Sequence, residues 1–189
     1  MILEWLDMSL FDLVRASSTR GRGLQGGLHL SMVRVLLRQL LLQLNVLSSL
    51  RCTHTDIKHK NCCLASGEYF MAKLPDGSTS PILTSPCVKF IDYGNAVFDG
   101  EEKTHPIHTK QFRAPEVLLN VRQGWSTPSD MWTLGITAAY LITGELLFNS
   151  HDPNELVQRM TEVLGPFSPA LLESARDGRM RRAAESASS

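Results

Sequence analysis

The sequence has few cysteines, and their spacing excludes a cysteine framework. The four cysteines, at positions 52, 62, 63 and 87, form no C-x-x-C pair and no Cys/His ladder of the zinc type. A chain of 189 residues is also too large to depend on disulfides for its stability. We therefore expect reduced thiols in a nuclear or cytoplasmic protein.

The sequence also lacks an excess of charge of either sign. Lysine and arginine together number 19, and so do aspartate and glutamate. No long-range field favours nucleic acid or a membrane surface, and the basic run RDGRMRR is expected to be solvated. Nucleic acid is therefore not expected as a partner, and an anionic ligand must be held by a local site.

No uninterrupted apolar run is long enough to predict a membrane span. The most apolar segment, at 33–47, is interrupted by two arginines, two glutamines and an asparagine, so we predict a long buried helix over about 29–50. The N-terminal stretch MILEWLDMSLFDLV lacks a basic region followed by an apolar core, so no signal peptide is expected either.

The residues that are present describe a globular domain with helices and a small strand element. Hydrophobic residues make up 43% of the chain and charged residues 20%. Two strand-like runs, CCLAS and VKFID, flank a stretch rich in proline, glycine and serine, which predicts a hairpin-like element with an insertion at 65–86. We expect the last residues, 176–189, to form a flexible tail.

Two later helices carry recognisable start and stop signals. The first is predicted to run from a cap at Thr127 to a stop at Gly144. The second is predicted to begin at Asp152 and to end at Gly165, with Glu155 closing a capping box.

The stretches HTDIKHKN and DYG hold the groups that phosphoryl transfer requires. A transferring phosphoryl group needs a divalent metal to neutralise its charge and a carboxylate to orient the attacking hydroxyl. Asp56 would be that carboxylate, and Lys58 would contact the transferring phosphate. Asn61 and Asp92 would supply oxygen ligands to Mg²⁺. These residues predict a phosphoryl-transfer site that uses Mg²⁺.

Together with APE at 114–116, these stretches resemble the ordered signature of the C-terminal lobe of eukaryotic protein kinases. The sequences HTDIK and GLHLSMVRVLLRQLLLQL most resemble those of the DYRK-like, splicing-associated and LAMMER (CDC-like) branch. The resemblance implies a mainly α (α+β) fold, a truncated kinase C-lobe over 1–175. It also implies a serine/threonine kinase that uses ATP and Mg²⁺ on a protein substrate, with splicing-related proteins as the candidate substrates.

The resemblance also implies roles for four supporting residues. Asp130 would hold the backbone of the catalytic loop, and His54 would pack behind that loop. Thr109 would meet the loop from the substrate-docking segment. Glu116 would seek an arginine from a later helix that the chain is not expected to contain.

Two features of the same region depart from the pattern or invite another interpretation. Thr55 stands where many kinases have arginine, so we expect phosphorylation of the activation segment to matter little. His105 and His108 have no third ligand at a suitable spacing, so we predict surface histidines and not a metal site.

The resemblance begins after the Gly-rich loop and the lysine with which kinases grip ATP, so the N-lobe is expected to be missing. The stretch GRGLQGG at 21–27 lacks flanking strands and is not predicted to replace that loop. Two hypotheses follow: an active kinase lobe, or a catalytically silent lobe that binds a partner protein or the missing N-lobe. The silent lobe would bind through the helix at 152–164 or through its N-lobe-facing surface.

Overall fold

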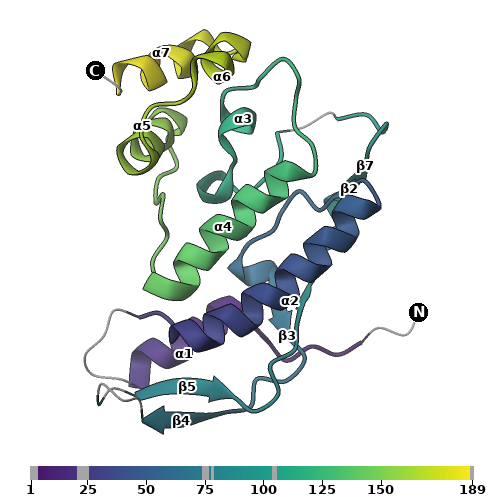
Figure 1. Ribbon diagram of the computed structural model, residues 1–189, viewed down its shortest axis with the longest axis vertical. Coiled ribbons are helices and arrows are strands. Elements are labelled where there is room, and N and C mark those ends of the chain that lie inside the picture. Colours follow the sequence, from purple (N-terminus) through teal and green to yellow (C-terminus); the bar gives the residue numbers. More distant parts are fainter. Residues whose placement is uncertain (1–3, 21–25, 74–76, 78, 104–105, 188–189) are drawn as a thin grey trace.

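Two long helices, α2 (Leu30–Ser49) and α4 (Pro128–Thr143), cross the middle of the molecule side by side (Figure 1). The computed structural model describes residues 4–20, 26–73, 77, 79–103 and 106–187. Smaller helices gather at one end and most of the strand residues near the other. The remaining helices are α1 (Leu10–Arg20), η1 (His59–Asn61), η2 (Tyr93–Asn95), η3 (Lys110–Phe112), α3 (Pro115–Leu118), α5 (Pro153–Leu164), α6 (Pro169–Ser174) and α7 (Gly178–Ser186).

Helix α2 forms over the predicted residues, but only one of its faces is buried, and Leu42 on the other is 61% exposed. Leu36 and Leu40 are fully buried, and Leu44 is nearly so, because apolar residues at helical spacing form one continuous face. Among the described residues α2 is also the one helix that could cross a membrane by length and composition alone, contrary to our expectation from its polar residues. A core helix passes the same test of length and composition.

The start of α2 is fastened to the end of α4 by direct backbone contact. The amide of Leu28 donates to the carbonyl of Leu141 at 2.7 Å. A Cβ at Gly27 would lie 1.9 Å from the carbonyl oxygen of Ile142, so no larger residue fits without moving the backbone. This junction fixes the two helices relative to each other.

The predicted strand pair is present, and a third strand extends it. Strand β3 (Cys62–Leu64) pairs antiparallel with β6 (Val88–Phe90), and β1 (Met8–Ser9) pairs with the other edge of β3. Strand β2 (Cys52–Thr53) pairs with β7 (Val97–Phe98). These short ladders place the loops after β2 and after β6 next to each other.

The segment between β3 and β6 contains a hairpin that we did not predict. Strands β4 (Tyr69–Lys73) and β5 (Thr79–Leu83) pair antiparallel over five residue pairs. Leu83 is 4% exposed and belongs to the main core, so the insertion is anchored to the lobe.

Two expectations about the C-terminal part are wrong. Helix α7 occupies most of the predicted flexible tail and packs on α5, with Met180 and Ala184 buried in the contact. The predicted capping box is not formed: Asp152 caps α5 by accepting the amide of Asn154, whereas Glu155 accepts from Ser150 and Arg159.

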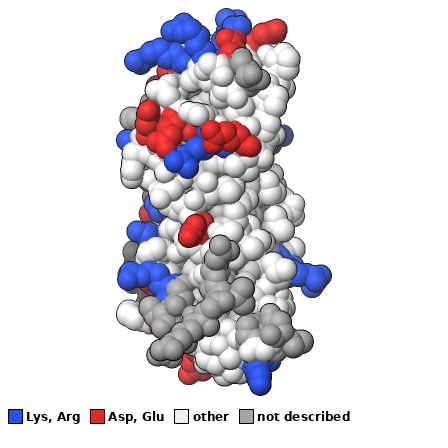
Figure 2. All heavy atoms as spheres, turned by 90° about the vertical axis from the view of Figure 1, so that its left-hand side faces the viewer, with Lys and Arg blue, Asp and Glu red and all other residues white. Residues whose placement is uncertain are grey.

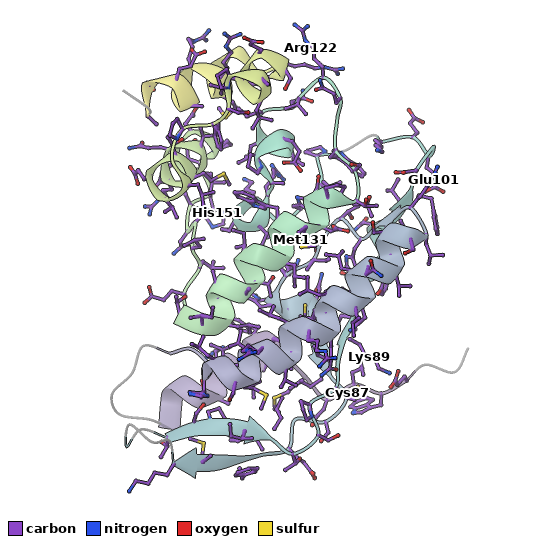
Figure 3. The ribbon with its side chains drawn as sticks, viewed as in Figure 1. Cys87, Lys89, Glu101, Arg122, Met131 and His151 are labelled. Atoms are coloured by element: carbon purple, nitrogen blue, oxygen red, sulfur yellow. The ribbon has the colours of Figure 1, made fainter. Side chains whose placement is uncertain are left out.

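The N-terminal segment carries one unusually exposed aromatic residue. Trp5 has 87% of its surface open to solvent. Nearby, Glu4 accepts two hydrogen bonds from Lys89 of β6, which is labelled in Figure 3. The indole is therefore displayed at the surface next to β6.

Candidate active site

Asp56 lies at the centre of a network of hydrogen bonds in the loop between β2 and η1. Its Oδ2 accepts from Lys58 Nζ at 2.6 Å and from Asn61 Nδ2 at 3.1 Å. Its Oδ1 accepts from Thr109 Oγ1 at 2.8 Å. The structure thus brings together four of the predicted site residues, although Thr109 is 53 positions from Asp56 in the chain.

The network keeps the carboxyl group of Asp56 ionised. Burial alone would raise the pKa of Asp56, but the hydrogen bonds from Lys58 and Thr109 and the charge of Lys58 outweigh it. The pKa is therefore below its ordinary value, and the group is a carboxylate at neutral pH.

Asp130, in the first turn of α4, holds the start of this loop. Its side chain is fully buried. Oδ2 accepts a hydrogen bond from the amide of His54 at 2.6 Å, and Oδ1 accepts one from the amide of Thr55 at 3.1 Å. Thr55 has a φ of 75°, a strained value for a β-branched residue. Its Oγ1 also donates to the carbonyl of Asn95 at 3.0 Å, so both ends of the residue are held.

His54 connects the loop to the segment after β6. Its ring lies against Phe90 and Tyr93, with centroids 5.7 and 4.7 Å away. Nδ1 faces the amide of Asp56 at 3.3 Å and Nε2 faces the carbonyl of Ile91 at 3.0 Å, which fits the tautomer with its proton on Nε2. His54 therefore lies directly behind the loop that carries Asp56.

Asp92 and Asn61 belong to adjoining segments. The amide of Ile91 donates to the carbonyl of Asn61 at 3.0 Å, so Asp92 follows the residue bonded to Asn61. Asp92 is exposed and has a φ of 67°, the left-handed region that a non-glycine residue rarely adopts. Asp92 is therefore adjacent in the chain to the contact with Asn61, but no hydrogen bond among the described residues joins its carboxylate to the Asp56 network.

The donor set of these two residues fits Mg²⁺. No other described group hydrogen-bonds to the carboxylate of Asp92 or to Oδ1 of Asn61, whose amide nitrogen is turned to Asp56. The described residues contain no group of three or more His, Cys, Asp or Glu that could hold a metal. One carboxylate and one amide oxygen suit Mg²⁺, which usually completes its shell with water and substrate phosphates.

Glu116 lies outside the Asp56 network. Its Oε1 accepts a short hydrogen bond from Ser129 Oγ, and it forms no ion pair within the described part of the chain. Two arginines, Arg122 and Arg176, nevertheless line the same cavity as Glu116. Neither of them lies on a helix or bonds to Glu116, so they are not the arginine from a later helix that the resemblance calls for.

The prediction of a surface position is wrong for His108. It is 6% exposed, because its amide donates to the carbonyl of Thr55 at 2.9 Å and draws it against the loop. Its Nε2 lies 3.8 Å from Asp130 Oδ1. His105 lies outside the described residues.

Arg113 supports the segment at Ile107 and His108, a role that the sequence analysis did not predict. It donates to the carbonyls of Ile107 and His108 at 3.0 and 3.1 Å, and burial lowers the pKa of its guanidinium. Its position directly before APE was the one available signal, and the sequence alone does not show which carbonyls it reaches.

A cleft of about 560 Å³ opens beside Asp56. The walls include Asp56 and Thr109 from the network, and residues that follow Gly94 on the opposite side. A hydroxyl-bearing segment entering the cleft would meet an ionised carboxylate with a lysine ammonium 2.6 Å from it.

Comparison with known proteins gives consistent results. Residues 1–178 match the family model described as protein kinase domain. Serine/threonine-protein kinase AFC1 of Arabidopsis thaliana is 36% identical over 183 residues, covering 91% of this chain and 37% of the relative. Dual specificity protein kinase CLK1 of Mus musculus is 28% identical over 180 residues, covering 95% and 36%. A crystal structure of a kinase domain has a TM-score of 0.80 at 30% identity, covering 94% of this chain and 52% of that one. The chain therefore spans little more than a third of the length of these two curated relatives.

Proposed function

This chain belongs to the protein kinase domain family, and on that premise we propose that it transfers the γ-phosphoryl group of ATP to serine or threonine hydroxyls of a protein. The predicted kinase-like fold and the predicted likeness to the DYRK-like and LAMMER branch are both confirmed by the relatives and by the solved kinase domain. Protein kinases generally use ATP and Mg²⁺. The activity of this chain is our proposal.

The observation that supports the proposal is the state of the Asp56 carboxylate. In the proposed reaction, the substrate hydroxyl oxygen bonds to the γ-phosphorus while the bond from that phosphorus to the bridging oxygen of ADP breaks. The hydroxyl proton passes to Asp56, which is ionised and already accepts a hydrogen bond from the hydroxyl of Thr109 at 2.8 Å. Lys58 would place its ammonium on the transferring phosphate.

The same residues suit the nucleotide and its metal. Asn61 and Asp92 would hold Mg²⁺, which supplies positive charge that neutralises the phosphate oxygens. Asp130 would keep the loop in position through the amides of His54 and Thr55. We further propose a substrate connected with RNA splicing, because the sequence GLHLSMVRVLLRQLLLQL resembles the long helix of splicing-associated kinases. We also propose a nuclear or cytoplasmic location, which the four free cysteines support.

Asp56→Asn tests the proposal against the hypothesis of a silent binding lobe. Transfer of labelled phosphate from ATP to a serine-rich protein should fall about 100-fold or more, because the general base is lost. Asp99→Asn is the matched control, since Asp99 is exposed and makes no side-chain bond among the described residues. Equal rates for wild type and Asp56→Asn would contradict the assigned role.

Nucleotide binding gives a second, separate test. ATP with Mg²⁺ should raise the unfolding temperature, and Asp92→Asn should remove the part of that shift that depends on Mg²⁺. A chain that shows no shift at millimolar ATP and transfers no phosphate would favour the silent binding lobe.

A further inference from the structure

A second cavity, of about 480 Å³, lies beside the cleft at Asp56 and carries an excess of positive charge. Among the described residues that line it, three are basic, Lys103, Arg122 and Arg176, and one is acidic, Glu116. We refer to it as the arginine cavity. Since the chain as a whole is neutral, this local excess is set by the fold and not by the composition.

The backbone holds the two arginines on one wall. Val121 forms an antiparallel bridge with Ala175, and the amide of Arg122 donates to the carbonyl of Ser174 at 2.9 Å. Arg176 Nη2 then donates to the carbonyl of Arg122 at 3.1 Å. Figure 3 shows Arg122 at the end of the molecule where α6 and α7 lie, and Figure 2 shows basic and acidic side chains together at that end.

The arginines are not already neutralised. Neither Arg122 nor Arg176 forms an ion pair with any residue that the structure describes. The nearby Glu116 is engaged by the hydroxyl of Ser129. Unpaired guanidinium groups have donors left over, and their fork of N–H groups matches phosphate and carboxylate oxygens.

The arginine cavity adjoins the catalytic cleft through shared walls. Lys103, Pro106 and Trp125 line both. Lys103 is fixed between them, because its Nζ donates to the carbonyl of Trp125 at 2.7 Å and lies 4.7 Å from the centroid of that ring. A peptide with its hydroxyl at Asp56 would therefore have the arginine cavity beside it.

We propose that the arginine cavity binds an anionic side chain of the protein substrate, a phosphorylated serine or threonine or an acidic residue near the acceptor hydroxyl. This inference rests on the proposed function, since it assumes that a peptide occupies the cleft at Asp56. It makes Arg122 and Arg176 residues that determine substrate specificity.

Peptide binding measured by fluorescence anisotropy tests the inference without needing catalysis. The probes are labelled serine peptides with phosphoserine, glutamate or alanine at successive positions on either side of the acceptor. At one position, phosphoserine should tighten binding about tenfold or more over alanine, as charge-assisted hydrogen bonds to two arginines would. A gain for phosphoserine alone identifies phosphate as the ligand, and an equal gain for glutamate shows that a carboxylate suffices.

The double variant Arg122→Gln with Arg176→Gln should abolish the preference. Its matched control is Arg34→Gln with Arg38→Gln, which removes the same charge from two exposed positions on α2 and should leave the preference intact. Arg122→Lys with Arg176→Lys keeps the charge but loses the fork, and should weaken the preference in part. Circular dichroism of each variant checks that it is folded.

Three results would overturn the inference: no preference at any position, a preference that survives Arg122→Gln with Arg176→Gln, or one lost equally in the α2 control. Asp56→Asn separates this inference from the proposed function. It should stop phosphate transfer and keep the binding preference, whereas failure of the proposed function alone would leave transfer unchanged by Asp56→Asn.

Discussion

His59 is a titratable residue enclosed by aromatic rings immediately after the catalytic-loop lysine. Its ring centroid lies 5.1 Å from that of Phe11, 4.2 Å from that of Tyr140 and 5.3 Å from that of Phe112. Its Nδ1 is buried without a hydrogen-bond partner among the described residues. Burial first, and the charges of Lys60 and Lys58 second, lower the pKa of His59 from 6.5 to about 4.

The folded protein should therefore lose stability in mild acid. Between pH 6.5 and 4 the unfolded chain binds a proton at His59 that the folded chain does not, so the free energy of unfolding falls as the pH drops through this window. From pH 7 to pH 5 the loss from this residue should be about 2 kcal/mol, measured by urea unfolding.

His59→Phe is the control, because it keeps a ring of similar size and removes the proton. The difference between wild type and His59→Phe isolates the contribution of His59. Asp56 does not interfere, since its lowered pKa places its own stability loss at pH values below its ordinary 3.8. An equal loss in wild type and His59→Phe would contradict the prediction.

The site residues show how far sequence reasoning reaches at this scale. Asp56, Lys58 and Asn61 could be grouped in advance because they are close in the chain and their chemistry is complementary. The burial of His108 could not, since it follows from a bond to Thr55 across 53 positions. The loss of the capping bond by Glu155 likewise depends on Ser150 and Arg159 competing for its carboxylate.

At the scale of elements, the junction of α2 and α4 gives a sharp test. Gly27→Ala would place a methyl group 1.9 Å from the carbonyl oxygen of Ile142, so the backbone must shift and stability should fall by about 1–3 kcal/mol. Gly135→Ala is the matched control, because Gly135 is an exposed position inside α4 with no atom within 4 Å of a new Cβ. It should gain about 0.5–1 kcal/mol from helix propensity.

Urea unfolding of the two variants at one pH measures both effects. If both variants changed the free energy of unfolding in the same direction, the close contact between Gly27 and Ile142 would not constrain the folded protein. Far-UV circular dichroism would show whether α2 keeps its helix content in Gly27→Ala.

Among the elements, the helices with local signals were predictable and those that depend on packing were not. Helix α4 begins at Pro128 and ends at Thr143, although the predicted cap Thr127 makes no side-chain capping bond. Gly144, directly after the helix, adopts the left-handed φ of 77° that its position requires. Helix α7 has few apolar residues, and the surface of α5 that buries Met180 and Ala184 is visible only in three dimensions. The hairpin was hidden because Pro81, normally a strand breaker, lies inside β5.

At the scale of the whole molecule, one helix joins the two main cores. Helix α4 contributes Leu134, Tyr140 and Leu141 to the core around α2, and Ile136 to the core around α5 and α7. The two cores should therefore lose their structure together, as a single cooperative unit.

Urea unfolding followed by two probes tests this cooperativity. Tryptophan fluorescence includes Trp132, which stacks on Phe148 in the second core, while far-UV circular dichroism follows all helices. The two transitions should coincide. Met160→Ala, at a fully buried position of the second core, should shift both midpoints equally and cost about 2–5 kcal/mol. Separate midpoints would show that the cores unfold independently.

The exposure of Trp5 has a practical consequence for following association. A small collisional quencher in the solvent reaches an indole that is 87% open far more readily than the partly covered indoles of Trp125 and Trp132. Any macromolecule that settles on the N-terminal segment would shield that fluorophore, so the protein reports occupancy there through its own emission, without a label.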